Sequence, residues 1–337
     1  MMKAIQRTTA FLLVFMLAAW ASIGAAFATT PMRVAMVLWR GETEVERGFR
    51  DYLAEQGVNV RIEVFNLDRD MSRLPAVLAA LRVRPPDLVY AWGTSITLGV
   101  AGRWDAKESG KQLTGIPILF TMVAAPWETG IAPPSSQSAR PDVTGVSHIA
   151  PLATQINAIR SYLPLRKLGI VYNPGESNSV SNVAALRRQA KIQEFTLLEA
   201  PVPLGRDGQP AALAIPRLVD ELAAKGAQVL YIGPDNFIGN HRHVLTSSGI
   251  AKGIPSFTAT ELEIRDGEAM FGLISRYDMV GRLTAAKARA ILFDRRLPAE
   301  IPIETLDRFN YLIRLPIARR LKLYPPLPLL RYAEIIE

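Results

Sequence analysis

Short apolar runs alternate with helical patterns along the first half of the chain. Strands are expected at residues 33–39, 58–65, 88–92 and 116–121. Apolar residues at helical spacing predict helices over 44–56 and 74–82 between them. The run at 33–39 has no helical period, which is typical of a strand buried in a parallel sheet. Strands that alternate with helices predict right-handed βαβ units and a parallel sheet.

The second half of the chain repeats this plan. Residues 168–172 match the first strand, 229–236 match 89–95, and 253–258 match 115–121. Such self-similarity predicts two copies of one α/β lobe. Because ligands bind outside the carboxyl ends of parallel strands, the two loop-bearing edges are expected to face each other across a cleft.

The clearest single stretch runs from Leu168 to Ser179. An apolar strand ends at Pro174 and Gly175, which turn the chain toward a helical pattern over 180–192. Ser177, Asn178 and Ser179 offer side-chain oxygens that are expected to cap this helix. The alternatives are a plain turn and cap, or a loop whose polar groups bind a small solute at a positive helix end.

Several crossings between the lobes are expected. They fall at residues 142–147, 271–275 and 301–304, and a helix over 279–293 is expected to pack on the first lobe. Proline-rich residues 325–328 preclude a helix there, and 329–336 are expected to form a short helix at best. The predicted fold is therefore α/β, with two similar doubly wound parallel-sheet lobes and a multi-strand hinge. The predicted parts are a signal peptide at 1–28, lobe 1 at 29–143 plus 274–300, and lobe 2 at 144–273 plus 301–337.

The N-terminal residues have the pattern of a secretory signal. Lys3 and Arg7 precede an apolar run over 11–21, and Ala26 and Ala28 form a small-residue site, which predicts cleavage before residue 29. An uncleaved membrane anchor is the alternative, although the run is short for a span. A protein exported to the periplasm is expected. The sequence contains no cysteine, which excludes a lipid-attachment cysteine, a disulfide and thiolate chemistry.

Composition places the chain among ordinary globular proteins. It has 337 residues, of which 49% are hydrophobic and 21% charged, and two domains are the better expectation. The formal net charge of +8 comes from basic residues scattered singly or in pairs. Without a basic run or an aromatic-interleaved stripe, a nucleic-acid partner is not expected. A monomer that binds a small-molecule solute is expected.

Five motifs, met in order, resemble the substrate-binding proteins of ABC transporters of the tryptophan/tyrosine-binding type. They are Val143–Ser147, Tyr172–Ser179, Pro234–Asn236, Ile254–Phe257 and Tyr277–Gly281. The resemblance covers nearly the whole mature chain. It implies the type I periplasmic-binding (Venus flytrap) fold, and a receptor that delivers a small solute to a membrane permease driven by a cytoplasmic ATPase. The departures at Thr260, Arg276 and Asp278 put amino-acid specificity in doubt, because a charge near the cleft must be paired.

The resemblance also implies which loops face the ligand. The positions carried over are Thr94, Ser95, Asn173, Glu176, Asn178, Ser179, Asp235 and Asn236. Thr260 joins them from its place after a predicted strand, and Trp39, Trp92 and Phe237 are candidates for an aromatic slot or for lobe core.

These residue types suit an amino acid. Hydroxyls of Thr94 and Ser95 at a helix N-terminus suit a carboxylate. Either Glu176 or Asp235 suits an ammonium group through a charge-assisted hydrogen bond. Plain caps and turns are the alternatives for these positions.

Two other classes of function stay open. Glu176 and Asp235 form a carboxylate pair that a cleft hydrolase would use, although no nucleophile elbow, phosphate loop or metal-ligand spacing is present. A sensory module that signals to a membrane receptor would use the same cleft. His241 and His243 are spaced to face apart, and His148 is expected at the surface or hinge. No catalytic residue, metal or cofactor is expected.

Overall fold

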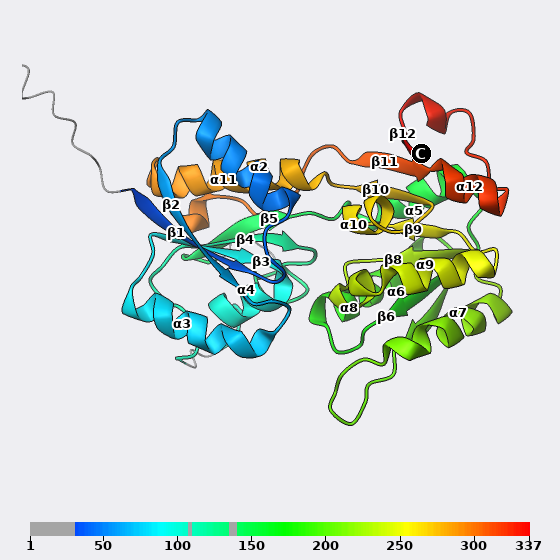
Figure 1. The fold of residues 1–337 in the computed structure, drawn as a ribbon, viewed down its shortest axis with the longest axis horizontal. Helices are drawn as coiled ribbons and strands as arrows, with labels where there is room; N and C mark the ends of the chain where they lie inside the picture. Colours follow the sequence, from blue (N-terminus) through cyan, green and yellow to red (C-terminus); the bar gives the residue numbers. More distant parts are fainter. Residues whose placement is uncertain (1–30, 107–109, 135–139) are drawn as a thin grey trace, which may run out of the picture. The chain divides into compact units, whose positions relative to one another are not determined.

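The computed structural model describes residues 31–106, 110–134 and 140–337 (Figure 1). The predicted signal peptide at 1–28 lies outside the described residues. Two mainly parallel sheets with helices on their faces organise residues 33–337. Among the helices of the described ranges, none combines the length and the apolar character that a bilayer crossing needs.

The first sheet has five strands in the order β2-β1-β3-β4-β5. The strands are β1 (Met32–Leu38), β2 (Val60–Asn66), β3 (Leu88–Trp92), β4 (Ile118–Val123) and β5 (Val143–Ser147). The pairs β1–β3, β3–β4 and β4–β5 are parallel. Helices α3 (Leu74–Val83) and α4 (Gly93–Ala101) cover one face, and α2 (Glu44–Glu55) lies on the other with α11 (Tyr277–Leu292) (Figure 1).

The second sheet has seven strands in the order β12-β11-β10-β9-β8-β6-β7. Its strands are β6 (Lys167–Tyr172), β7 (Thr196–Pro201), β8 (Val229–Ile232), β9 (Ser256–Thr258), β10 (Phe271–Ile274), β11 (Asn310–Arg314) and β12 (Glu334–Ile336). The order β7-β6-β8-β9-β10 repeats the order of the first sheet. The predicted duplication is thereby confirmed.

Additional strands extend this second sheet beyond the repeat. Strand β11 is antiparallel to β10, and β12 is parallel to β11. The remaining helices are α5 (Leu152–Tyr162), α6 (Ser177–Ile192), α7 (Ile215–Ala224), α8 (Asn236–Asn240), α9 (Arg242–Ala251), α10 (Glu261–Arg265) and α12 (Leu315–Leu321). The expectation of a helix over 329–336 was wrong. Only a 3₁₀ turn, η4 (Leu329–Arg331), forms there, because residues 334–336 pair with β11 instead.

Contacts between sequence-distant segments join the two halves. Helix α11 follows β10 of the second sheet and packs on α2 of the first, as expected. Residues near 304 run beside β5, where the Ser147 amide donates to the Glu304 carbonyl at 2.9 Å. Strand β5 itself pairs with β4, so the first expected crossing leaves directly from the first sheet.

A capping box fixes the loop that follows β1. The Glu46 carboxylate accepts from the Thr43 amide at 2.7 Å and from the Thr43 hydroxyl at 2.8 Å. The same buried carboxylate accepts from the hydroxyl of Tyr90 on β3. The start of α2 is therefore tied to the neighbouring strand, which holds the loop around Arg40 in place.

Helix α6 begins differently from the prediction. It starts at Ser177, its N-cap residue is Glu176, and no side chain caps it. The expectation that Ser177, Asn178 and Ser179 cap this helix was wrong. Asn178 and Ser179 lie inside the first turn, where their side chains bond to the loop that follows β8.

Candidate functional site

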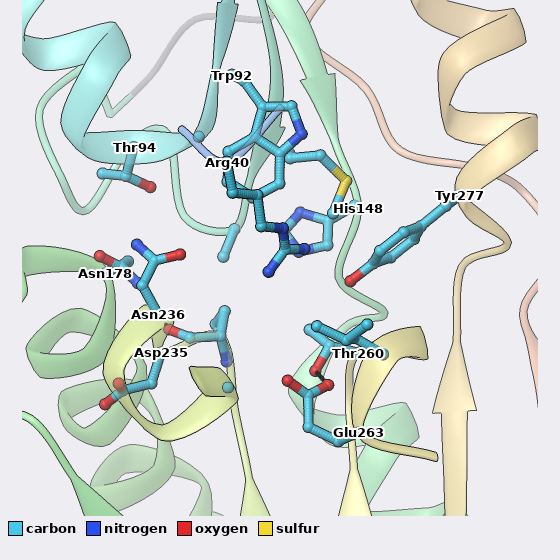
Figure 2. Close-up of a pocket in the computed structure, with 16 residues that line it drawn as sticks. Arg40, Trp92, Thr94, His148, Asn178, Asp235, Asn236, Thr260, Glu263 and Tyr277 are labelled. Atoms are coloured by element: carbon cyan, nitrogen blue, oxygen red, sulfur yellow. Dashed lines mark hydrogen bonds between the residues drawn. The ribbon is translucent and has the colours of Figure 1, made fainter. Parts of the chain in front are cut away.

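A cavity of about 520 Å³, measured with its open mouth, lies where loops from both sheets meet. Those from the first sheet all follow the carboxyl ends of strands. Arg40 follows β1, Trp92 is the last residue of β3, and Thr94 comes shortly after it. Met122 lies near the end of β4, and His148 follows β5. In Figure 2 the labelled side chains of Arg40, Trp92, Thr94 and His148 approach the cavity from one side.

The second sheet contributes residues in the same way. Asn178 lies at the start of α6, Asp235 and Asn236 follow β8, Glu263 lies beyond β9, and Tyr277 follows β10. In each sheet the strand order reverses direction between the first and third strands of the repeat. The cavity therefore lies at the topological switch points of both sheets, where open α/β sheets bind ligands.

Two charged side chains face the cavity from different sheets. The Arg40 guanidinium lies over the Trp92 ring, 5.0 Å from its centroid, and among the described residues it has no hydrogen bond or ion pair. Glu263 is buried, and one of its oxygens accepts from the Thr260 hydroxyl. Burial raises the pKa of Glu263. A guanidinium and a carboxyl group are thus available to a ligand.

Within the described residues, three buried polar atoms at this cavity have no hydrogen-bond partner. They are Trp92 Nε1, His148 Nδ1 and Asn178 Oδ1. An unpaired buried polar group costs free energy, so native structures rarely leave one without a reason. Their gathering at one cavity leaves three hydrogen-bonding atoms open to a ligand.

His148 and Tyr277 form one wall of the cavity. Their rings meet edge to face at 6.5 Å between centroids. Burial, reinforced by the charge of Arg40, lowers the pKa of His148 to about 3. Burial raises the pKa of the Tyr277 phenol. Both rings are therefore neutral at physiological pH and offer hydrogen bonds without charge.

The burial of His148 predicts a pH-dependent stability. In the unfolded chain this ring titrates near pH 6.5, whereas in the folded protein its pKa is about 3. Its contribution is present above pH 6.5 and is lost as the pH falls. Between about pH 7.5 and 5.5 we expect His148 to reduce the free energy of unfolding by about 1 kcal/mol. Denaturant unfolding of His148→Gln should lack this loss.

His243 provides the matched control, because it is exposed on α9. His243→Gln should keep the wild-type pH dependence. An equal slope for wild type and His148→Gln would contradict the prediction.

The backbone is strained where Met122 enters the cavity. Its φ of +56° lies in the left-handed region that residues other than glycine rarely adopt. The pairing of β4 with β5 shifts register at the same place, between Phe120 and Val123. Such strain gathers at functional sites because the surrounding structure enforces it.

Two carboxylates hold the loops of the second sheet together. Glu176 accepts from the amides of Asn236 and Phe237 at 3.0 and 2.9 Å. Asp235 accepts from the Asn173 amide at 2.7 Å and from the Ser179 hydroxyl at 2.7 Å. Burial and the nearby Glu176 raise the pKa of Asp235 to about 7. These bonds fix the cavity floor, where Asn178 donates to the Pro234 carbonyl at 2.8 Å.

Comparisons with known proteins agree with this geometry. The family described as ABC transporter substrate binding protein matches residues 35–336. The chain belongs to this family. A curated relative, the tyrosine-binding protein of Clostridioides difficile strain R20291, is 23% identical over 270 residues, which cover 80% of this chain and 71% of that protein.

Two solved structures share the fold of this substrate-binding protein. A conserved domain protein of Vibrio cholerae has a TM-score of 0.77 at 21% identity, with 91% of this chain and 100% of that chain covered. An ABC domain from Streptococcus pneumoniae, solved in complex with L-Trp, has a TM-score of 0.77 at 19% identity and the same coverage. The predicted two-lobe periplasmic-binding fold is thus confirmed.

The structure brings together half of the sequence-predicted site residues. Those that line the cavity are Thr94, Asn178, Asp235, Asn236 and Thr260. Among these, Asp235 points its carboxylate away from the cavity in Figure 2, toward the amides that it accepts from.

The other predicted positions lie outside the cavity lining for identifiable reasons. Trp39 packs against the core of the first lobe, and Ser95 lies on α4 one residue beyond Thr94. Three further positions use their polar atoms in hydrogen bonds within and between the loops that follow β6 and β8, namely Asn173, Glu176 and Ser179. Phe237, a candidate slot wall, stacks on His241 with 4.4 Å between ring centroids.

Sequence reasoning missed four polar or charged side chains of the cavity, namely those of Arg40, His148, Glu263 and Tyr277. The expectation of a surface position for His148 was wrong, because its ring is buried. The alternative of a hinge position is not contradicted, since His148 directly follows β5, the first expected crossing. The internal repeat contained a signal for Arg40, since its loop occupies the place that the loop of Asn173 has in the second copy.

Arg276 does not affect the charge of the cavity. Its guanidinium donates to Asp278 at 3.0 and 2.8 Å, and the pair lies outside the cavity lining. The two departures from the family pattern at 276 and 278 therefore compensate each other.

Proposed function

We propose that the chain is the extracytoplasmic receptor of an ABC importer. It captures a small solute, an amino acid or a related compound, and delivers it to the permease in the cytoplasmic membrane. The observation that carries the proposal is the cavity itself, where strand-end loops of both sheets present a guanidinium, a carboxyl group and three buried polar atoms without a partner among the described residues. The two lobes of this proposal are 29–143 with 274–300, and 144–273 with 301–337.

Within this proposal, Arg40 and Glu263 hold the two ends of a zwitterion. Arg40 is free to form two parallel hydrogen bonds with a carboxylate, next to Thr94 at the uncapped start of α4. Glu263 accepts from the ammonium group. These roles replace those expected for Glu176 and Asp235, whose oxygens already accept from backbone amides.

The ligand would also control lobe closure. A solute held by Arg40 and Glu263 contacts both lobes only when they are closed, so binding shifts the population toward the closed form. The relatives support aromatic amino acids as first probes, because one is named a tyrosine-binding protein and another was solved with L-Trp.

Neither alternative class gains support from the cavity. A hydrolase would need two carboxylates facing the bound substrate, but Glu176 lies outside the cavity lining and Asp235 points away from it. A sensory module would bind the same solute without transport. Uptake of labelled solute by cells with and without the chain separates importer from sensor.

The proposal is tested by calorimetry and thermal shift on a matched set of tyrosine, tyramine and 3-(4-hydroxyphenyl)propionate. Tyramine lacks the carboxylate and the propionate lacks the ammonium group. We expect tyrosine to bind best, with about 2.7 kcal/mol of stabilisation at 100 times its dissociation constant.

The same thermal-shift measurement is made with a wider panel of amino acids, nucleosides and small carboxylates. Failure of every panel member to stabilise the protein would contradict the receptor proposal. If tyrosine and the propionate bound equally well, this would contradict the proposed contact of Glu263 with the ammonium group but not the receptor proposal. Chemical turnover of a bound compound would favour an enzyme.

A further inference from the structure

A second surface, remote in sequence from the cavity residues, combines exposed apolar side chains with uncompensated positive charge. It comprises residues 315–333, which we call the C-terminal basic surface. This stretch carries four exposed cations, Arg319, Arg320, Lys322 and Arg331, and contains no aspartate or glutamate. Tyr324, Leu327, Leu330 and Tyr332 are 67, 79, 45 and 63% exposed.

The exposed side chains are held on an ordered support. Leu329 is buried in the core of the second lobe, and the Tyr162 hydroxyl donates to the Leu323 carbonyl at 2.8 Å. Three prolines in residues 325–328 fix the backbone on either side of Leu327. Leu327 therefore lies in a proline-restrained loop between α12 and η4. Figure 1 shows α12 in red near the C-terminal end of the chain.

Nearby acids leave most of the positive charge uncompensated. Arg319 lies 3.9 Å from Glu337, and Glu334 is paired with Arg265 at 2.9 Å. For Arg320, Lys322 and Arg331, no ion pair forms within the part of the chain that the structure describes. This charge favours an anionic partner.

We propose that the C-terminal basic surface docks on a bilayer that contains anionic phospholipid. Cations attract the headgroups, tyrosine rings prefer the membrane interface, and Leu327 enters the shallow apolar layer. A protein partner fits less well, because the core of a protein interface is depleted of charge, whereas here cations and apolar residues alternate along the chain. Docking would keep a receptor without a lipid-attachment cysteine near the membrane.

The test is cosedimentation of the full chain with vesicles at low salt. One set is pure phosphatidylcholine and the other contains about one third phosphatidylglycerol. We expect a partition coefficient roughly tenfold higher on the anionic vesicles, falling steeply with added salt. Leu327→Asp and the triple variant Arg320→Gln, Lys322→Gln, Arg331→Gln should each abolish this difference.

Matched controls separate the surface from general charge. Leu213→Asp changes an exposed leucine elsewhere, which is 97% exposed against 79% for Leu327. The triple variant Arg84→Gln, Lys191→Gln, Arg206→Gln removes the same net charge from scattered exposed positions. Both should bind like wild type. Equal binding to both vesicle types, no binding, or equal loss in the control triple would overturn the proposal.

Light scattering detects self-association of the chain, and solute binding is measured in the same variants. A concentration-dependent dimer that Leu327→Asp abolishes would assign the surface to self-association and overturn the proposal. Solute binding should be unchanged in every variant, so the outcome is independent of the receptor proposal.

Discussion

Replacing Arg40 by alanine is expected to weaken solute binding by roughly a hundredfold or more. Arg40 has no hydrogen-bond partner among the described residues, yet it lines a cavity that also holds unpartnered buried atoms. Removing one member of a desolvated, hydrogen-bonded charge pair costs about 2–5 kcal/mol, or roughly 30- to several-thousand-fold in affinity. Calorimetry with tyrosine or the best compound of the panel measures the effect.

The stability of the solute-free protein provides an independent readout. Because Arg40 lies over the Trp92 ring and forms no hydrogen bond or ion pair with a described residue, we expect the free energy of unfolding to change by less than about 1 kcal/mol. Arg40→Lys should bind with intermediate affinity, since lysine keeps the charge but not the planar fork. Arg47→Ala removes an exposed arginine of α2 and should bind like wild type. Unchanged affinity in Arg40→Ala would refute the proposed carboxylate site.

The pattern of apolar and polar residues predicted the architecture, because the burial of apolar side chains determines that pattern along each strand and helix. The apolar runs at 33–39 and 168–172 correspond to β1 and β6, which lie inside the sheets with neighbours on both sides. The repeat predicted equal strand orders, and equal orders place the loops of both sheets at corresponding edges. What the pattern could not supply was the edge of the second sheet. A three-residue strand such as β12 has no periodicity to detect.

The candidate site was predicted at the level of loops and not of atoms. Residue type indicated that Glu176 and Asp235 could bind an ammonium group, but type does not reveal which acceptors are already used. Both carboxylates bond to amides of neighbouring loops, a fact that depends on how β6 and β8 lie side by side. Conversely, His148 is a site candidate because its Nδ1 has no hydrogen-bond partner among the described residues, a fact that residue type does not reveal.

The position of one cavity residue depends on the packing of α2 and α11 behind the cavity. The Glu46 carboxylate joins α2 to β3 through its hydrogen bond with Tyr90. Helix α11 packs so closely on α2 that the space between their backbones holds no Cβ at Gly48 or Gly281. Tyr277, which lines the cavity, is the first residue of α11. The crossing of these two helices therefore sets the position of a binding residue. This coupling makes the crossing a place where a stability defect also becomes a binding defect.

Replacing Gly281 by alanine is expected to destabilise the fold by at least about 3 kcal/mol. A Cβ at this position would lie 1.9 Å from the Val45 carbonyl oxygen and 2.8 Å from the Phe49 amide nitrogen, both backbone atoms of α2. On the other helix, a Cβ at Gly48 would meet the Asp278 carbonyl oxygen at 2.0 Å. Backbone atoms cannot move aside as a side chain can, so the helices must separate and lose buried packing.

Thermal unfolding and solute binding together test this expectation. For a protein of this size, 3 kcal/mol corresponds to a melting temperature lower by about 4–5 °C. Gly99→Ala is the matched control, since its Cβ would meet the Leu74 side chain, which can rotate away. It should cost much less, partly offset by the better helix propensity of alanine. Because separation of α2 and α11 displaces Tyr277, Gly281→Ala should also bind solute more weakly, whereas Gly99→Ala should not. Equal melting temperatures for the two variants would show that the helices tolerate a wider spacing.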